Sequence, residues 1–239
     1  MTNAFAETIL LQRNDASYKT GYGFVMLTTA ELVTHYYGLL HIKERQFADG
    51  LKYEQRRHSY LLGRVAAKTA ISRITPQAPD SIFIDNGVFQ FPIVNYIAGE
   101  NIQVSISHCD HSAAALAFPE KYPMAIDLEA IDSDNAALIR QQLTPHESRS
   151  WPDNCLDSRI GAVMLWTLKE ALSKVLRTGL TLDWKVFEVD RISRKGIVWE
   201  SSFSHIHQYK GISRVYNDHI VSIVLPGDSC LDEDCFFGK

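Results

Sequence analysis

Apolar residues recur at helical spacing in two long segments of the chain, Leu51–Ile74 and Ser158–Arg177. The apolar stripe of the first segment is formed by Leu61, Val65, Ala66, Ala70 and Ile71. Pro76 and Pro79 follow the first segment, and Gly179 follows the second. Proline and glycine both commonly occur where a helix ends. The pattern therefore predicts two long helices, one in each half of the chain.

Short apolar runs between polar turns predict strands. The predicted strands are Phe24–Leu27, Gln103–Ser107, Ala113–Phe118, Met124–Glu129 and three or four more within Lys185–Leu225. Ser81–Phe91 is typical of a hairpin, because its central Asn86-Gly87 supplies the positive φ angles of a tight turn. The polar segment His108–Ser112 predicts another turn. The first twenty residues give no clear pattern, and the last dozen are typical of a loose tail.

A capping box predicts where one further helix begins. Thr144 is the expected N-cap, Pro145 is the first helical residue, and Glu147 is the third.

Three weak internal matches occur at nearly the same offset. Ser107–Pro119 resembles Arg214–Pro226 (226 − 119 = 107). Arg64-x-x-x-Lys68 resembles Glu170-x-x-x-Lys174 (170 − 64 = 106), and Ile84-Asp85 resembles Val189-Asp190 (189 − 84 = 105). The matches predict an α+β fold made of two similar halves, residues 1–122 and 123–239. We expect each half to pack a small antiparallel sheet on a long helix, in a pseudo-two-fold pair with the ligand site between the halves.

The composition limits the classes of function. The 239 residues are 46% hydrophobic and 22% charged, which is ordinary for a globular protein, and the net charge is −4. Since no dense basic run is present, we do not expect nucleic acid as a partner. No apolar run approaches the ~20 residues that span a bilayer. No signal peptide opens the chain, which favours a cytoplasmic location, and the four cysteines form no C-x-x-C pair.

Two carboxylates alternate on one predicted strand. Asp127 and Glu129 share a face, while Ile126 and Leu128 point the other way. Two adjacent carboxylates repel each other unless a cation lies between them, and Mg²⁺ prefers such oxygen ligands. The alternative is an edge strand with a solvated acidic face.

The second long helix carries Trp166, Glu170 and Lys174 at intervals of four residues, so that they form one stripe. Glu170 is a candidate third metal ligand, and Lys174 is a candidate phosphate contact. The alternative is an ordinary exposed Glu–Lys pair, which stabilises a helix by a few tenths of a kcal/mol, about 0.2–0.5.

The first long helix carries aligned cations. Arg57 and Arg64 are two turns apart, and Lys68 continues their stripe, which suits a polyanionic ligand or a solvated basic face. A glycine inside a helix, here Gly63, destabilises the helix by up to ~1 kcal/mol relative to alanine. Its presence would be explained if a ligand or another part of the chain passes close to this position.

His108 and Ser107 end a strand and are candidate donors to a phosphate, although a single histidine is more often structural.

Taken in order, these features resemble the Sfp-type 4'-phosphopantetheinyl transferases, the double-length branch of that superfamily. The resembling segments are Arg57…Gly63-Arg64, Ser105-Ile-Ser107-His108, Ile126-Asp127-Leu-Glu129, Leu143-Thr-x-x-Glu147 and Trp166-Thr-x-Lys169-Glu170-Ala-x-x-Lys174. The resemblance covers roughly Gln55 to Val189. The chain departs from the family at Gly87-Val-Phe-Gln-Phe-Pro92, where G-K-P is common, and at Leu143, where Phe is commoner.

The resemblance implies a site and a reaction. Mg²⁺, or Mn²⁺ in its place, would be bound by Asp127, Glu129 and Glu170 and by the diphosphate of coenzyme A. His108 and Lys174 would contact diphosphate oxygens, with Ser107 assisting His108. Arg57 and Arg64 would hold the nucleotide end. The second half would then be the catalytic half and the first the nucleotide-binding half.

The implied reaction uses an apo carrier protein of the acyl, aryl or peptidyl kind. Its serine attacks the β-phosphorus, Glu170 is the usual candidate for the base, and 3',5'-adenosine bisphosphate leaves. Because the chain is double-length, we expect a monomer. Two alternatives remain: another Mg²⁺-dependent enzyme acting on a diphosphate, and a non-catalytic paralogue that binds carrier proteins or coenzyme A.

Overall fold

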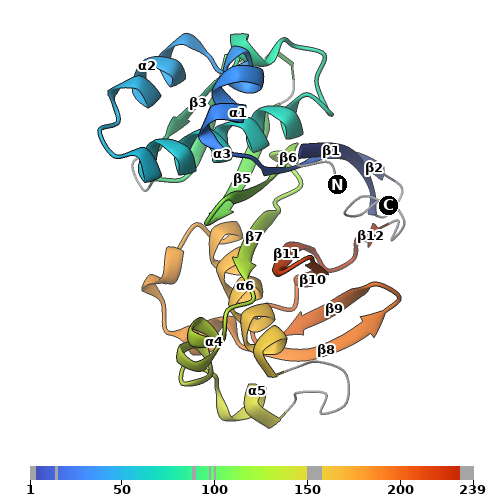
Figure 1. The fold of residues 1–239 in the computed structure, drawn as a ribbon. Helices are drawn as coiled ribbons and strands as arrows, with labels where there is room; N and C mark the ends of the chain where they lie inside the picture. The colour runs from blue at the N-terminus through green and yellow to red at the C-terminus, as the bar shows by residue number, and fades with distance from the viewer. Residues whose placement is uncertain are drawn as a thin grey trace. The chain divides into compact units, whose positions relative to one another are not determined.

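The computed structural model describes residues 4–13, 16–87, 90–96, 98–99, 101–149 and 158–231, except for the side chains of 133–135, 158, 180 and 231. The chain divides into two compact units (Figure 1). The first unit runs to Pro123 and includes the short strand β12 (Cys230–Leu231), and the second is Met124–Ser229. Each unit has its own sheet, its own long helix and its own buried apolar cluster.

The first unit contains a five-stranded antiparallel sheet in the order β12-β1-β2-β6-β5, beside the two-stranded sheet β3-β4. Its strands are β1 (Ala4–Arg13), β2 (Ala16–Met26), β3 (Phe83–Asn86), β4 (Pro92–Asn95), β5 (Ile102–Cys109) and β6 (Ser112–Pro119). The β5–β6 hairpin is tight, since Cys109 pairs with Ser112 across a two-residue turn.

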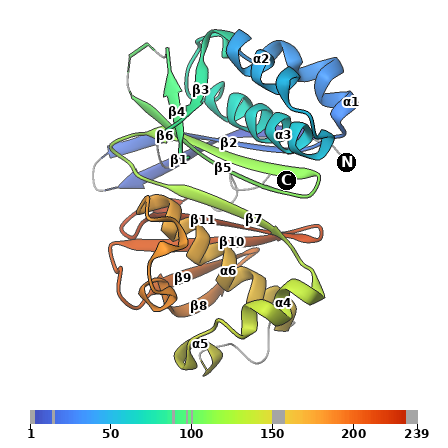
Figure 2. The same ribbon diagram turned by 90° about the vertical axis from the view of Figure 1, so that its left-hand side faces the viewer.

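The helices of this unit lie together on one face of the five-stranded sheet (Figure 2). They are α1 (Thr29–Glu31), α2 (Ile42–Gly50) and α3 (Glu54–Ile71), with a π-helical turn at Leu32–Tyr36 and 3₁₀ turns at Tyr37–Leu39 and Pro79–Ser81. The long helix α3 packs against β2, β5 and β6. Gly21 permits this approach, because a Cβ there would lie 1.9 Å from the backbone oxygen of Ala70.

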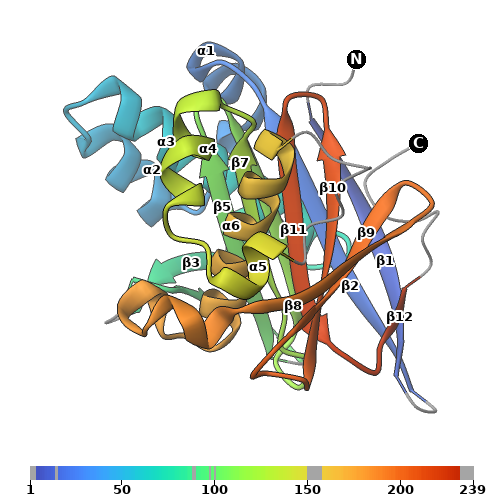
Figure 3. The ribbon, with the colours of Figure 1, turned by 90° about the horizontal axis from the view of Figure 1, so that it is seen from below.

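The second unit contains a five-stranded antiparallel sheet in the order β7-β11-β10-β9-β8. Its strands are β7 (Ala125–Ala130), β8 (Val189–Lys195), β9 (Val198–Phe203), β10 (Tyr209–Tyr216) and β11 (His219–Pro226). Its helices are α4 (Ser133–Arg140), α5 (Pro145–Arg149) and α6 (Ser158–Val175), with 3₁₀ turns at Gly179–Thr181 and Trp184–Phe187. Helix α6 packs on β7, β11 and β10, and α4 packs on α6 (Figure 3).

Most predicted elements are confirmed. Both long helices are present, and so are the predicted strands, including four strands in the last segment. The expected capping box is formed, because the Glu147 amide donates to the Thr144 hydroxyl and the Thr144 amide donates to the Glu147 carboxylate. The mixed helical and antiparallel content agrees with the predicted α+β class. Among the described helices, none has both the length and the apolar character needed to cross a membrane.

One segment for which the sequence made no prediction is ordered, and one predicted turn is wrong. The first twenty residues, which show no clear sequence pattern, hold strand β1 and part of β2. The hairpin does not turn at Asn86-Gly87, since Asn86 still pairs with Pro92. A wider turn is closed instead by the Gly87 amide, which donates to the Phe91 carbonyl at 2.8 Å. The predicted strand positions Val88 and Phe89 lie outside the described residues.

Each unit contains a fully buried glutamate–lysine pair with the same set of bonds. In the first unit, Glu44 lies 2.9 Å from Lys68, and it accepts the amides of His41 and Ile84. In the second unit, Glu147 lies 2.7 Å from Lys169 and accepts the amides of Thr144 and Val189. In both, the glutamate joins a helix start, a long helix and a strand.

These bonds correct one of the internal matches. The sequence comparison aligned Lys68 with Lys174, whereas the shared contacts make Lys169 the counterpart of Lys68. The sequence match followed the spacing of charged residues along the helix, which does not distinguish a buried lysine from a partly exposed one.

Candidate functional site

Strand β7 holds Asp127 and Glu129 on one face, at the edge of the second sheet. The Asp127 side chain is almost completely buried, with 4% of its surface exposed, and Glu129 is half-buried. A solvated acidic face would leave both carboxylates in water. The burial of Asp127 therefore argues against that alternative.

Helix α6 places two charged side chains against Asp127. The Lys174 ammonium donates to Asp127 Oδ1 at 2.6 Å and to the backbone oxygen of Ile126 at 3.1 Å. The pKa of Glu170, one helical turn earlier, is raised by its burial and then by the negative charge of Asp127. Glu170 and Lys174 thus belong to one electrostatic cluster with Asp127, which an isolated Glu–Lys surface pair would not form.

The donor set is chemically suited to a hard divalent cation. Asp127, Glu129 and Glu170 all offer carboxylate oxygens, the ligands that Mg²⁺ prefers. In the part of the chain that the structure describes, no group of three or more His, Cys, Asp or Glu side chains is arranged to hold an ion. The three-carboxylate metal set therefore stays a prediction.

The buried pair Lys169–Glu147 fixes the part of α6 that carries this cluster. Lys169 immediately precedes Glu170, and its side chain is fully buried, with its ammonium over the ring of Trp184. Burial lowers the pKa of Lys169, and Glu147 opposes that shift. Because Glu147 also holds β8 through Val189, the pair anchors the rotation of α6 about its own axis. The sequence analysis named Lys169 only as part of a motif, without this role.

A cavity of about 660 Å³ in the second unit borders Glu129, one of the three candidate carboxylates. It is lined by Glu129, Ala130, Leu138, Ile139, Gln142, Val163, Trp166, Leu182 and Trp184. The rings of Trp166 and Trp184 lie 5.0 Å apart and form part of its wall. The cavity is mostly apolar, with Glu129 and Gln142 as its polar residues.

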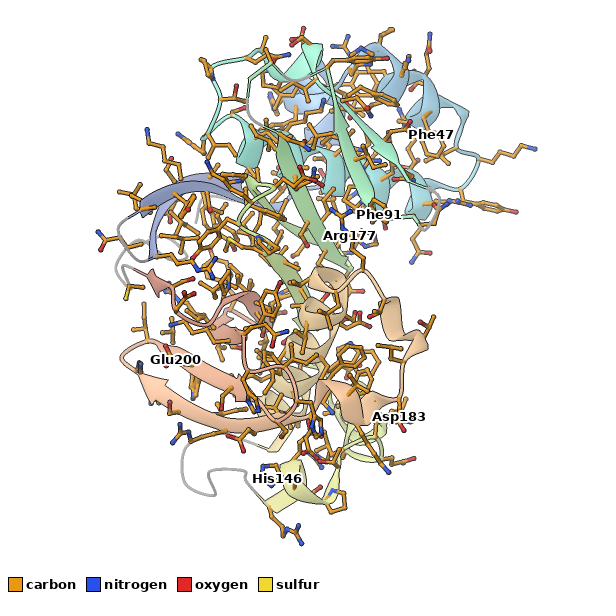
Figure 4. The ribbon with its side chains drawn as sticks, turned by 180° about the vertical axis from the view of Figure 1, so that it is seen from behind. Phe47, Phe91, His146, Arg177, Asp183 and Glu200 are labelled. Carbon is orange, nitrogen blue, oxygen red and sulfur yellow. The ribbon has the colours of Figure 1, made fainter. Side chains whose placement is uncertain are left out.

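A second cavity, of about 590 Å³, lies in the first unit. It is lined by Phe47, Leu51, Tyr53, Gln55, Arg56, Ser59, Tyr60, Asn86 and His108. Phe47, labelled in Figure 4, comes from α2, and His108 comes from the end of β5. Helix α3 supplies Gln55, Arg56, Ser59 and Tyr60. An anion in this cavity would meet Arg56 and His108.

The predicted cations of α3 are distributed differently from the expected stripe. Arg57 points to Asp49, with its Nη2 3.4 Å from Oδ1. Arg64 is buried, lies over the ring of Tyr60 and donates to Asn86 at 3.1 Å. Neither of these arginines nor the buried Ser107 lines the cavity, so their assignment to the nucleotide remains a prediction.

Lys68 is not part of a ligand-facing stripe. Its side chain is fully buried, is paired with Glu44 and donates to the backbone oxygens of Pro79 and Ile82.

The glycine at position 63 is explained by the close approach of strand β5. A Cβ at this position would lie 3.2 Å from the Ile106 side chain on β5.

Arg56 is a candidate ligand-binding residue that the sequence motifs did not identify. It is exposed and lines the first cavity beside Gln55, Ser59 and Tyr60. The sequence did contain a signal for this grouping, because Ser59 and Tyr60 follow Arg56 by three and four residues and such residues share a helical face.

Comparison with known proteins bears on the second unit. Residues 123–224 match the family model of the 4'-phosphopantetheinyl transferase superfamily. The matched stretch includes Asp127, Glu129, Glu170 and Lys174. The similarity to the superfamily that the motifs indicated is thereby confirmed for this part of the chain.

One similar solved structure is a holo-(acyl-carrier-protein) synthase from Bacillus anthracis strain Ames in complex with coenzyme A (3',5'-ADP). It is 24% identical, with a TM-score of 0.38, and the alignment covers 46% of this chain and 96% of that chain. None of the curated proteins compared with this chain matches it.

Proposed function

We propose that this protein transfers the 4'-phosphopantetheine group of coenzyme A to a serine hydroxyl of an apo carrier protein, as an Sfp-type transferase. The observation that carries the proposal is the contact of Lys174 with the buried Asp127, with Glu170 beside them, within the stretch that matches the superfamily. A buried cluster of two carboxylates and a lysine suits a diphosphate with its metal ion.

Asp127, Glu129 and Glu170 would hold Mg²⁺, or Mn²⁺ in its place. The ion would supply positive charge to the diphosphate oxygens. Lys174, which now neutralises Asp127, would donate to a phosphate oxygen as a point charge once the carboxylate has another partner.

The serine proton needs an acceptor when the hydroxyl attacks the β-phosphorus. Glu170 is our candidate, as the resemblance to the Sfp-type transferases implies, and its carboxyl belongs to the same charged cluster as Asp127 and Lys174. The new P–O bond forms to the serine oxygen, the bond to the leaving phosphate breaks, and 3',5'-adenosine bisphosphate departs. Glu170 keeps the proton until it passes to solvent.

The two cavities suit different parts of coenzyme A. The first cavity offers Arg56 and His108 to the phosphates of the nucleotide end, with aromatic side chains at its wall. Arg57 and Arg64 would also hold the nucleotide end, and Ser107 would assist His108, although none of the three lines this cavity. The second cavity borders Glu129 and has the apolar surface and the Gln142 amide that suit the pantetheine arm.

The shared Glu–Lys bonding of the units supports an origin as two related halves. We therefore propose the pseudo-two-fold, double-length arrangement and a monomer as the active form. The carrier would be of the acyl, aryl or peptidyl kind.

Intact-mass spectrometry tests the proposed reaction. An apo carrier protein incubated with this protein, coenzyme A and Mg²⁺ should gain the mass of one phosphopantetheine, and excess EDTA should abolish the gain. Re-addition of Mg²⁺ should restore it. If carriers of the acyl, aryl and peptidyl classes all stay unmodified while they bind the protein, the non-catalytic alternative is favoured instead.

Replacing Arg56 with alanine should raise the KM for coenzyme A about tenfold, since one charge-assisted hydrogen bond is worth roughly 1.4 kcal/mol or more. The kcat should change little, because Arg56 would contact the nucleotide end of coenzyme A and not the reacting β-phosphorus. Steady-state kinetics at varied coenzyme A measures both constants. Arg73→Ala is the matched control, because Arg73 is an exposed arginine just past the end of α3. An unchanged KM in Arg56→Ala would remove the first cavity from the proposal.

A further inference from the structure

Two histidines of the first unit face each other through their ring nitrogens. Nε2 of His58, on α3, lies 3.4 Å from Nδ1 of His111, in the turn between β5 and β6. The rings are 5.3 Å apart between centroids and tilted by 66°. A hydrogen bond from N–H usually spans 2.7–3.2 Å, so this separation is long for a direct bond. The proposed transfer reaction uses neither residue.

The separation agrees with two ligands of one metal ion. Nitrogen ligands of tetrahedral Zn²⁺ lie at ~2.0–2.1 Å, so two of them at a tetrahedral angle are about 3.3 Å apart. We propose that His58 Nε2 and His111 Nδ1 form a binding site for a divalent transition-metal ion of the Zn²⁺ type.

The surroundings of His58 prepare its nitrogen for this role. Nδ1 of His58 lies 3.0 Å from the Thr29 hydroxyl, and a proton on Nδ1 donated to that oxygen leaves the Nε2 lone pair directed at His111. Only 7% of the His58 side chain is exposed. Burial, followed by the charge of His111, lowers the pKa of His58, which favours the neutral form that binds metals.

His111 is also held in place. It occupies a two-residue turn closed by the Cys109–Ser112 pair, with Asp110 at φ 49°. Its side chain is exposed, so water can complete the coordination. Glu54, one helical turn before His58 and exposed, can rotate to add an oxygen ligand. Within the described residues no set of three such ligands is already assembled, so the site is one of two fixed nitrogens.

Ligand chemistry separates this site from the carboxylates of the second unit. Imidazole nitrogens select Zn²⁺, Ni²⁺ and Cu²⁺, whereas carboxylates suit Mg²⁺. A metal bound here would join α3 to the end of β5, which supply Arg56 and His108 to the first cavity. Any effect of this metal on coenzyme A binding in the first cavity rests on the proposed function, but the metal site itself does not.

The test is a calorimetric titration of the full-length protein with Zn²⁺ in a large excess of Mg²⁺, which occupies the carboxylates. We expect one Zn²⁺ site in the parent protein and an affinity at least tenfold weaker in His111→Ala and His58→Gln. His35→Ala removes an exposed histidine of the same unit and should match the parent.

A second measurement keeps the test decisive if His58→Gln fails to fold. Zn²⁺ should raise the melting temperature of the parent protein and of His35→Ala, but not that of His111→Ala, whose substituted side chain is exposed. Equal Zn²⁺ affinity and equal thermal shift in the parent and His111→Ala would overturn the proposal and leave the pair as an imidazole hydrogen bond. Both readouts are independent of transfer activity, so an inactive protein does not affect them.

Discussion

Replacing Asp127 with asparagine should reduce phosphopantetheine transfer by at least 10²–10³-fold, the usual cost of losing one essential electrostatic contact at a reacting centre, about 2.7–4 kcal/mol. The amide is nearly the same size as the carboxylate, so the packing of β7 should be preserved. What is lost is the negative charge that now binds Lys174 at 2.6 Å and that would bind the metal ion. The rate of carrier modification, followed by intact mass at saturating coenzyme A and Mg²⁺, measures the effect.

Asp190→Asn is the matched control for this experiment. Asp190 lies on β8, at the opposite edge of the same sheet, and its side chain is about half exposed. This variant should retain parental turnover. Circular dichroism of both variants would show that the second unit is folded. An Asp127→Asn protein that is folded and transfers phosphopantetheine at the parental rate would show that this cluster is not the catalytic site.

Local patterns were sufficient to predict both long helices, the start of α5 and most strands, whereas α1, α2 and α4 were not predicted. The apolar spacing located α3 and α6, and the Thr144–Glu147 capping box was visible in four consecutive residues. Strand β1 was not predicted, because its pairing with β2 sets its position and only Ile9 and Leu11 are deeply buried. Asn86-Gly87 has the composition of a tight turn, but the pairing of Asn86 with Pro92 overrides that local preference.

The same limit applies to the candidate site. Alternation along β7 and four-residue spacing along α6 predicted which side chains share a face, and the structure brings Lys174 and Glu170 to Asp127. Spacing alone does not say what a helical face meets. The α3 face with Lys68 turns to the buried Glu44, and the face with Arg56 turns to a cavity. A row of charged side chains along a helix can bind a ligand only where the neighbouring residues leave space for that ligand.

The motif around α6 serves the fold and the chemistry with adjacent residues. Lys169 is fully buried and binds Glu147, whereas Glu170 and Lys174 lie toward Asp127. Successive helical positions point about 100° apart, so anchoring Lys169 also sets the direction of Glu170. Part of what Lys169 contributes to this segment is therefore the geometry of the helix, and stability should depend on it as strongly as activity does.

Glu147→Gln should destabilise the second unit by roughly 3–5 kcal/mol, because it leaves the Lys169 ammonium buried without a counter-charge. All four tryptophans of the sequence lie between residues 124 and 229, so tryptophan fluorescence during urea unfolding reports on this unit. The urea midpoint should fall sharply. The double variant Glu147→Gln/Lys169→Met should recover a large part of the loss, since it removes the buried charge as well.

Glu200→Gln provides the comparison for an ion pair that water still reaches. Glu200, labelled in Figure 4, binds Lys195 and Lys210 on the second sheet with about a third of its side chain exposed. Its replacement should cost no more than ~1 kcal/mol. If Glu147→Gln costs no more than Glu200→Gln, or if the double variant is less stable than Glu147→Gln alone, then the buried pair does not anchor α6, and Glu170 must be oriented by other contacts of the helix.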